Sequence, residues 1–420
     1  MKERTRKTTT RRKFLETGAA AGAAIAASPL AFPTLALAQA REFKVGVIGC
    51  GGRGTGAAKN AIDAGEISGD KVVIHAVADL FEDRTIPAQR SFKVDEKRAF
   101  TGFDGFQKVC ETDCDYVILG SPPHFRPQHF EAAINAGKHV FTEKPVAVDP
   151  PGIRKFLAAG EKAKEKGLSV AAGTQRRHQQ AYIETQKRIA DGAIGDIVAG
   201  RCYWNQGGLW TREKESGWSD MEWQIRNWLY FTWLSGDHIV EQHVHNLDVI
   251  NWFLGAHPVR ARGMGGRQVR TGHAKYGNIF DHFATELIYP NGVRITSMCR
   301  QIEGCWNDVS EFVVGTKGGS NCSNEIFGPN AWKFSGKGID PYVQEHVDLI
   351  ESIKKGGGTL NETQNVSHST MTAILARTAC YTGKEVSWDK LIASDAKLGP
   401  EKYEFGAIDI PEIARPGNAM

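Results

Sequence analysis

The sequence lacks a strong imbalance of charge. Lysine and arginine number 52 against 48 aspartate and glutamate residues, which leaves a net charge of only +4 over 420 residues. A protein that binds the phosphates of nucleic acid has an excess of lysine and arginine clustered on one face. Part of this small surplus lies in the N-terminal tail, so we expect no nucleic-acid partner.

Long apolar runs and internal repeats are also absent. Beyond the N-terminal region, no stretch approaches the roughly 20 apolar residues that a transmembrane helix needs, so we expect no membrane span. The composition is ordinary for a globular protein, and 420 residues are enough for two domains around a large core.

Residues 1–40 are predicted to be an export signal rather than part of the fold. They contain the twin-arginine pattern TRRKFL at 10–15, a weakly apolar run at 18–31 and a small-residue cleavage site, AQA, at 38–40. The alternative is a basic tail before a transmembrane helix, but the run is short and rich in glycine. We therefore expect a periplasmic protein, exported already folded by the twin-arginine route.

Cysteine is scarce, with eight residues in the whole chain. In an exported protein these residues could form disulfides, but folding before export favours reduced, buried thiols. Cys110 and Cys114 are spaced C-x3-C, which is not a usual zinc spacing. We expect these two side chains to pack at a helix end.

What the sequence does contain is a glycine loop between a strand and a helix. Residues 43–60 read FKVGVIGCGGRGTGAAKN, and the pattern G-x-G-x-x-G follows a β-branched run of the kind a buried parallel strand uses. Gly49 allows the tight turn, Gly51 lets the backbone approach a pyrophosphate, and Gly54 lets helix and strand pack closely. The helix N-terminus then faces phosphate, which predicts a dinucleotide site.

The next strand, 71–80, ends at an acidic residue, Asp79. A carboxylate at that position can hold both ribose hydroxyls of NAD and repels the 2′-phosphate of NADP. No arginine follows at once, although Arg84 is near, so we favour NAD and leave NADP open.

Further strands and helices alternate up to about residue 172, which predicts a doubly wound parallel sheet, an α/β Rossmann domain. One strand, 115–120, runs into Ser121-Pro122-Pro123-His124, a turn at the strand end where such sheets bind ligands. After residue 173 the pattern changes to longer strands at 196–206, 259–266, 282–289, 293–300 and 311–315, with a hairpin turn at 289–293. A second, α+β domain with a large, open and mostly antiparallel sheet is expected, closed by helices at 343–354 and 367–381.

With these motifs in place, the chain resembles the Gfo/Idh/MocA oxidoreductases. The resemblance covers nearly the whole mature chain and is carried by VGVIGCGGRG, GSPPHFRPQHFEAAINAGKHVFTEKP, GTQRRH, HIVEQHVHNLD and STMTAILARTACYTGKEV. It implies a Rossmann domain at 41–175, a substrate and oligomerisation domain at 176–360, and a closing helix with a C-terminal tail at 361–420. It also implies sugar or polyol substrates, a homo-oligomer, and a catalytic lysine in Glu-Lys-Pro, which is Lys144 here.

The loop, the strand ends and the resemblance together predict a set of cofactor-binding residues. These are Gly49, Gly51, Gly52, Arg53, Gly54, Asp79, Ser121, Pro122, His124, Glu143 and Lys144.

The predicted helix 239–254 carries a second cluster of polar residues. The family pattern Asp-x-x-x-His-x-x-Asp reads Glu241, His245 and Asp248 here, so the first acid is one methylene longer. On a regular helix these three side chains share one face. Two carboxylates that bracket one imidazole can orient it and hold its positive form. A solvated polar face with an ordinary histidine is the alternative.

A metal site is a further alternative on the same helix. His238, Glu241 and His245 are plausible ligands, whereas His243 points away from them on a regular helix. We expect no metal and assign the cluster to catalysis.

Hydride transfer from an alcohol needs a base near the hydroxyl and the carbinol carbon near the nicotinamide. We expect Lys144 and His245 to converge on one substrate hydroxyl. Lys144, with an ordinary pKa of about 10.4, acts as the base only if its surroundings lower that value. Otherwise it polarises the oxygen and His245 is the base. The sequence leaves both possibilities open.

Substrate contacts are expected from basic and aromatic residues. Arg177 follows the last parallel strand, and Arg226 and Trp228 lie in an aromatic segment at 221–234. Arginine and tryptophan suit sugar rings, which offer hydroxyls and an apolar face. The other aromatic residues of that segment are expected in the core.

Export also bears on how the cofactor is held. A freely diffusing NAD would be lost outside the cytoplasm, so we expect NAD to be tightly bound and regenerated in place. The leading prediction is a sugar or polyol oxidoreductase. A glycoside hydrolase that works by transient oxidation, elimination, hydration and re-reduction is the first alternative, and a non-catalytic sugar-binding protein is the second.

Overall fold

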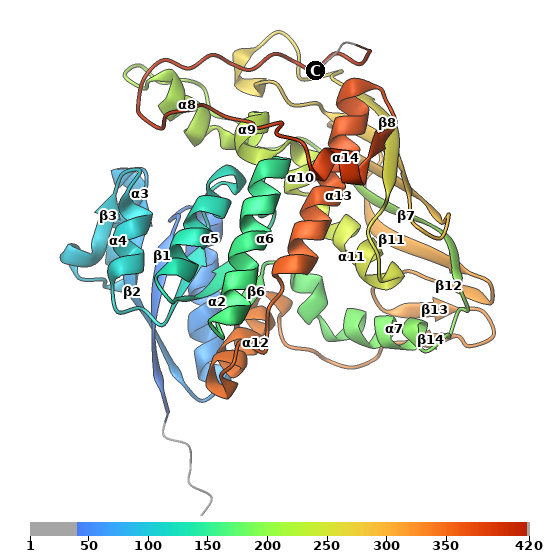
Figure 1. The fold of residues 1–420 in the computed structure, drawn as a ribbon, viewed down its shortest axis with the longest axis horizontal. Coiled ribbons are helices and arrows are strands. Elements are labelled where there is room, and N and C mark those ends of the chain that lie inside the picture. The colour runs from blue at the N-terminus through green and yellow to red at the C-terminus, as the bar shows by residue number, and fades with distance from the viewer. Residues whose placement is uncertain (1–39, 418–420) are drawn as a thin grey trace, which may run out of the picture. The chain divides into compact units, whose positions relative to one another are not determined.

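The computed structural model describes residues 40–417, so the predicted export signal, apart from Ala40, lies outside the described residues. The first half of the fold is a six-stranded parallel sheet in the order β3-β2-β1-β4-β5-β6 (Figure 1). The order reverses between β1 and β4, which is where doubly wound sheets open a crevice for ligands. The strands are β1 (Glu42–Ile48), β2 (Lys71–Asp79), β3 (Ala99–Thr101), β4 (Tyr116–Leu119), β5 (His139–Thr142) and β6 (Val170–Ala172).

Helices cover both faces of this sheet, so its strands are apolar on both sides. Val45 and Val47 of β1 pack in one buried cluster with Ala57 of α2, whereas Ile48 belongs to a second cluster with Phe130 of α5. The helices of this half are α2 (Gly52–Ile67), α3 (Glu82–Phe92), α4 (Gly105–Glu111), α5 (Arg126–Asn135) and α6 (Pro150–Glu165). The predicted Rossmann fold is confirmed.

The second half is built on a nine-stranded sheet in the order β14-β13-β12-β11-β7-β10-β9-β8-β15. Only β7 and β10 pair in parallel; the other pairs are antiparallel, and β9 and β10 form the predicted hairpin. The strands are β7 (Ile197–Gln206), β8 (Arg260–Gly266), β9 (His282–Ile288), β10 (Arg294–Gln301), β11 (Asp308–Gly315), β12 (Gly318–Ser320), β13 (Glu325–Phe327), β14 (Trp332–Lys333) and β15 (Val386–Ser387).

Two long helices lie near the C-terminus, and the second of them joins the halves. Helix α12 (Pro341–Lys355) packs against α2, and α13 (Thr363–Thr382) packs against β8 and β9 on one side and α6 on the other (Figure 1). Nearly every residue of α13 is buried, because it has protein on all sides. The remaining helices are α7 (Gln180–Ala190), α8 (Asp220–Arg226), α9 (Thr232–Ser235), α10 (His238–Glu241), α11 (Val244–Leu254) and α14 (Trp388–Ile392).

The predicted continuous helix 239–254 is wrong, because the chain is interrupted between α10 and α11. The amide of His243 bonds back to the carbonyl of His238 (3.2 Å), and the amide of His245 bonds to the carbonyl of Gln242 (3.3 Å). This wide turn releases the carbonyl of Glu241 from the usual i to i+4 helical bond. The single polar face that a regular helix would give to Glu241, His245 and Asp248 therefore does not form.

The cysteines agree with the predicted burial. Seven are buried, Cys305 is exposed, and all eight are free. Cys110 and Cys114 pack around the end of α4, where the Cys114 thiol lies 3.0 Å from the hydroxyl of Thr112. Within residues 40–417, no helix is both long enough and apolar enough to cross a bilayer.

The glycine loop packs very closely against neighbouring backbone. Gly49 has a φ of +96°, and a Cβ there would lie 2.4 Å from the amide nitrogen of Ser121. A Cβ at Gly54 would lie 1.8 Å from the carbonyl oxygen of Gly49. The loop, α2 and β4 can approach this closely only because both residues are glycine.

We expect Gly54→Ala to destabilise the protein by more than about 2 kcal/mol, since the added methyl overlaps backbone that cannot move aside. Gly56→Ala, two residues further along α2, is the matched control, because its Cβ would meet only Arg53 Nη1 at 3.6 Å. Helix propensity predicts no loss of stability for this control. Urea unfolding measures both, and equal midpoints for the two variants would contradict the packing argument.

Candidate active site

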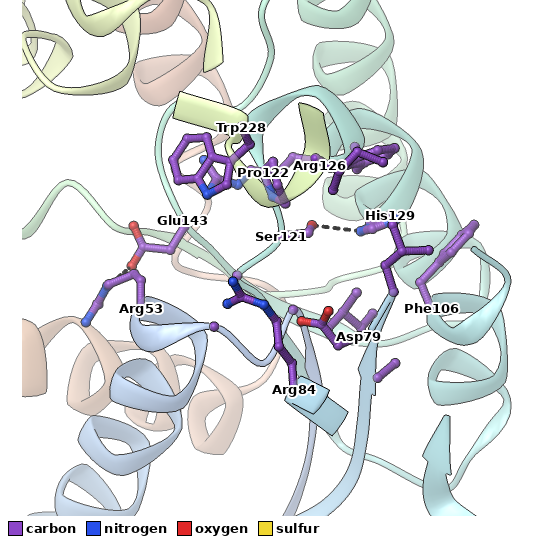
Figure 2. Close-up of a pocket in the computed structure, with 18 of the residues that line it drawn as sticks. Arg53, Asp79, Arg84, Phe106, Ser121, Pro122, Arg126, His129, Glu143 and Trp228 are labelled. Carbon is purple, nitrogen blue, oxygen red and sulfur yellow. Dashed lines mark hydrogen bonds and ion pairs between the residues drawn. The ribbon is translucent and has the colours of Figure 1, made fainter. Parts of the chain in front are cut away.

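A cavity of about 780 Å³ lies at the carboxyl ends of the parallel strands. Its walls come from both halves of the fold: the glycine loop and the ends of β2, β4 and β5 on one side, and α10, α11 and the loop after β7 on the other. Figure 2 shows Trp228 on the opposite side of this cavity from Arg84 and Asp79. Its size and position fit a dinucleotide crevice that extends into a substrate site.

The glycine loop and Asp79 form one end of the cavity. Asp79 accepts hydrogen bonds from the backbone amides of Cys50 (2.7 Å) and Phe81 (3.1 Å), which hold its carboxylate beside the loop. Burial raises the pKa of Asp79. A Cβ at Gly52 would meet nothing within 4 Å, so the loop backbone is open to a ligand. These features fit the pyrophosphate and adenosine ribose of NAD.

Ion pairs hold the side chains beside the glycine loop in place. Arg53, in the first turn of α2, pairs with Glu143 and also reaches Glu345 of α12 at 3.3 Å. Ser121 hydrogen-bonds His129 at 2.9 Å (Figure 2). Burial lowers the pKa of His129 to about 3, so its ring is neutral and orients the serine hydroxyl. Of the predicted cofactor residues, Gly49, Gly51, Gly52, Arg53, Asp79, Ser121, Pro122, Glu143 and Lys144 line the cavity.

Lys144 and Glu241 meet at the other end of the cavity. The Lys144 ammonium donates to the Glu241 carboxylate at 3.1 Å and to the Glu241 backbone carbonyl at 2.6 Å. That carbonyl is available because α10 stops at Glu241. Only 11% of the Lys144 side chain and 15% of the Glu241 side chain are exposed, so solvent screens this pair weakly.

His245 lies in the same cavity with a different electrostatic character from the one expected. Burial lowers its pKa well below 6.5, and the nearby ammonium of Lys144 lowers it further. Its ring stacks on Trp204 with 5.7 Å between ring centroids. The prediction of an imidazole held positive between two carboxylates is therefore wrong, because burial and the positive charges of Lys144, Arg176 and Arg53 disfavour the charged ring.

Asp248 does not bracket His245. Its two carboxylate oxygens accept from Nε of Arg177 (3.0 and 2.9 Å), and one also accepts from the hydroxyl of Ser369 (2.7 Å). Asp248 thus connects α11 to α13 and to the turn that follows β6. Arg177, predicted to contact substrate, does not line the cavity, because Asp248 and the ring of Trp252 hold its guanidinium.

Two further predicted residues also lie elsewhere. Arg226 pairs with Asp83 and Glu222, each at 2.9 Å, and stacks over Phe81, so its charge is used between α8 and α3. His124 bonds the hydroxyl of Tyr403 at 2.7 Å and does not line the cavity. Burial lowers the pKa of His124 to about 4.

The residues of the metal alternative are not brought together. His238 bonds the buried Asp237, and His243 bonds the hydroxyl of Ser297 at 2.7 Å. Across residues 40–417, no group of three or more histidine, cysteine, aspartate or glutamate side chains is placed to hold a metal ion.

Several cavity residues were missed from the sequence. Trp210 and Arg212 belong to an irregular loop after β7, Tyr342 begins α12, and Tyr403 lies in the C-terminal tail. A tryptophan two positions before an arginine was a usable signal for the first two. No local pattern points to a tyrosine 259 positions after Lys144.

The C-terminal tail crosses the adenosine end of the cavity. Tyr403 lines it, and the ring of Phe405 packs against Phe81 (6.1 Å) and Phe103 (5.4 Å), with distances between centroids. The tail is attached on both sides, since Leu398 donates to Asp149 at 2.8 Å and the carbonyl of Gly406 accepts from the amide of Met221 at 3.1 Å. The segment between these attachments is positioned to cover a bound ligand.

Fold and site together define a dinucleotide-binding enzyme scaffold with an open-sheet second domain. Residues 43–173 match the oxidoreductase family with an NAD-binding Rossmann fold, and residues 182–320 match the GFO/IDH/MocA C-terminal domain. The chain belongs to the Gfo/Idh/MocA oxidoreductase family and has its NAD-binding Rossmann domain.

Curated relatives are similar over part of their length. A 2,7-anhydro-N-acetylneuraminate hydratase of Escherichia coli (strain K12) is 26% identical over 49% of this chain and 50% of its own. A scyllo-inositol 2-dehydrogenase (NAD(+)) of Bacillus subtilis (strain 168) is 24% identical over 66% of this chain and 72% of its own. An inositol 2-dehydrogenase of Klebsiella pneumoniae (strain 342) is 29% identical over 51% of this chain and 55% of its own. The chain thus spans about half the length of the first and third of these.

Solved structures share the fold over more of the chain. A levoglucosan dehydrogenase in complex with NADH and levoglucosan has a TM-score of 0.65 at 18% identity, and covers 82% of this chain and 99% of its own. A scyllo-inositol dehydrogenase from Lactobacillus casei with NAD(H) and scyllo-inositol has a TM-score of 0.64 at 20% identity. It covers 83% of this chain and 99% of its own.

We expect the ring of His245 to be neutral at pH 6.5, where an ordinary histidine is half protonated, since burial and then Lys144 disfavour its charged form. Histidine NMR signals measure this, with His245→Asn identifying the resonance. In Lys144→Met the pKa should rise but remain below 6.5, because burial is the larger cause. A midpoint at or above 6.5 in the unmodified protein would contradict the assignment.

Proposed function

We propose that this protein is an NAD-dependent oxidoreductase that acts on a CH–OH group of a sugar or polyol. One observation carries the proposal: Lys144, Glu241 and His245 line the same cavity as the glycine loop and Asp79. The names of the inositol dehydrogenases among the relatives support a polyol or sugar as the substrate class.

NAD bound along the glycine loop would accept or supply the hydride. The roles of this chain's own residues follow from their charges. The carboxylate and carbonyl of Glu241 position Nζ of Lys144, so that it donates a hydrogen bond to the substrate oxygen and stabilises negative charge there. His245 is neutral, so it can accept the hydroxyl proton. This favours the second of the two possibilities that the sequence leaves open.

We further propose that NAD is tightly bound and that the protein is exported to the periplasm. Residence for hours, with an off-rate of about 10⁻⁴ s⁻¹ and an on-rate of about 10⁶ M⁻¹s⁻¹, corresponds to a Kd of about 10⁻¹⁰ M. Tyr403 and Phe405 support the proposal, since they lie across the adenosine end of the cavity.

A homo-oligomer is also proposed, through the face of the nine-stranded sheet that points away from α13. Met264 of β8 (78% exposed), Val314 of β11 and Phe327 of β13 are exposed apolar residues on this sheet. Such residues favour contact with another protein surface.

We expect Lys144→Met and His245→Asn each to lower turnover by about 10²- to 10⁴-fold, the usual effect of losing a proton donor or acceptor. Bound NAD should remain, because the glycine loop and Asp79 are untouched. Lys155→Met is the control, since this exposed lysine of α6 pairs only with Glu131 in the described chain. The assay follows absorbance at 340 nm and sugar release on a panel of polyols and glycosides.

Full activity in either variant would contradict the assignment of these residues. Release of sugar from glycosides without net reduction of NAD would instead show the hydrolase reaction. Tight binding of sugars with neither signal would show a non-catalytic binding protein.

We expect the double variant Tyr403→Ala with Phe405→Ala to release NAD about thirtyfold faster, since aromatic contacts contribute about 1 kcal/mol each. Trp306→Ala, an exposed tryptophan between β10 and β11, is the control. NAD remaining after timed dialysis measures the rate. Equal retention in both variants would show that the tail does not hold the cofactor.

A further inference from the structure

The arginines that line the cavity differ in what they contact. Arg53 is paired with Glu143 and Glu345. Arg126 is buried and donates to the carbonyl of Pro145 at 2.5 Å. Arg84 lies beside the glycine loop, with Nη1 3.0 Å from where a Cβ of Gly51 would be, so it belongs to the dinucleotide end. Arg212 comes from the other half of the fold and is exposed to the cavity.

Arg212 carries a charge that its neighbours do not neutralise. Glu213, next in the chain, pairs with Lys275 at 2.9 Å, and Lys214 pairs with Asp220 at 2.6 Å. Within residues 40–417 the Arg212 guanidinium forms no ion pair. The charges next to Arg212 are therefore matched to each other, and within the described chain Arg212 is left without a carboxylate partner at this wall of the cavity.

The loop that presents Arg212 is irregular but firmly held. The hydroxyl of Tyr230 donates to the carbonyl of Leu209 at 2.8 Å. The amide of Arg212 donates to the side chain of Asn227 at 2.9 Å, and its carbonyl accepts from the indole nitrogen of Trp223 at 2.9 Å. Three side chains thus fix the backbone around Trp210 and Arg212, which preorganises both residues for a ligand.

Two tryptophans accompany this cation. Trp210 lines the cavity with 46% of its surface exposed, and its ring meets Trp228 edge-on at 6.3 Å. The Arg212 guanidinium lies 5.9 Å from the Trp210 ring centroid. An indole offers a flat apolar surface to a sugar ring, and a guanidinium beside it matches the two oxygens of a carboxylate.

We propose that the substrate is a sugar or polyol that carries a carboxylate, which Arg212 binds while Trp210 and Trp228 contact the ring. The proposal rests on the proposed function and adds the substrate class to it. At the wall that Arg212 shares with Trp210 and Trp228, one unpaired cation suits one negative charge, whereas a phosphate monoester carries about two at neutral pH. A carboxylate leaves no uncompensated charge after binding.

Calorimetry on the NAD-loaded protein tests this with methyl glucuronide, methyl glucoside and glucose 6-phosphate. We expect the glucuronide to bind at least about tenfold more tightly than the glucoside, the effect of one charge-assisted hydrogen-bonded pair. Arg212→Met should remove the difference and leave bound NAD unchanged, and Arg212→Lys should keep part of it. Arg294→Met, an exposed arginine of β10 near Glu286, is the control and should keep all of it.

Equal or absent binding of the two methyl glycosides, or a preference that persists in Arg212→Met, would overturn the proposal. Tighter binding of glucose 6-phosphate would overturn the carboxylate, and loss of NAD from Arg212→Met would place Arg212 on the cofactor. Lys144→Met separates this question from the reaction, because it should lose turnover while keeping the preference. Tighter binding of the glucuronide without oxidation of any ligand would contradict the proposed function but would still support the assignment of Arg212.

Discussion

The contact between Lys144 and Glu241 is the interaction on which the rest of the site depends. Lys144 follows β5 in the parallel sheet, and Glu241 ends α10 in the second half of the fold. Carboxylate and carbonyl of Glu241 take two of the three ammonium donors. One donor is left to face the cavity. The pair therefore aims the lysine and joins the two halves where a substrate would lie between them.

Burial then gives the two central groups opposite characters. Lys144 forms an ion pair with Glu241 in a cavity where little of either side chain is exposed to solvent. His245 has no such partner and faces cations, so its pKa falls. A charged donor beside a neutral acceptor is the arrangement that an alcohol needs in order to lose its proton while the developing negative charge is stabilised.

The cavity is a joint product of distant parts of the chain. The glycine loop and Asp79 come from the first strands, and Trp228, Arg212 and Tyr403 come from later segments. Helix α13 packs against both halves. Asp248 adds to this frame by tying α11 to α13 and to Arg177. The Asp248 carboxylate binds Arg177 and Ser369 rather than His245. A helix pattern alone does not show these partners, so it wrongly assigned Asp248 to the histidine.

The sequence by itself determined the Rossmann fold, the glycine turn and the acid at the end of β2. Each of these depends on local chemistry, such as a positive φ at Gly49 or the absence of a Cβ at Gly54. Only the tertiary structure decided the partners of Asp248, Arg177, Arg226 and His124, the break before α11, and the places of Arg212 and Tyr403. These outcomes depend on contacts between residues far apart in the chain and on burial, which sets the charge of His245, and neither can be read from spacing along a single helix.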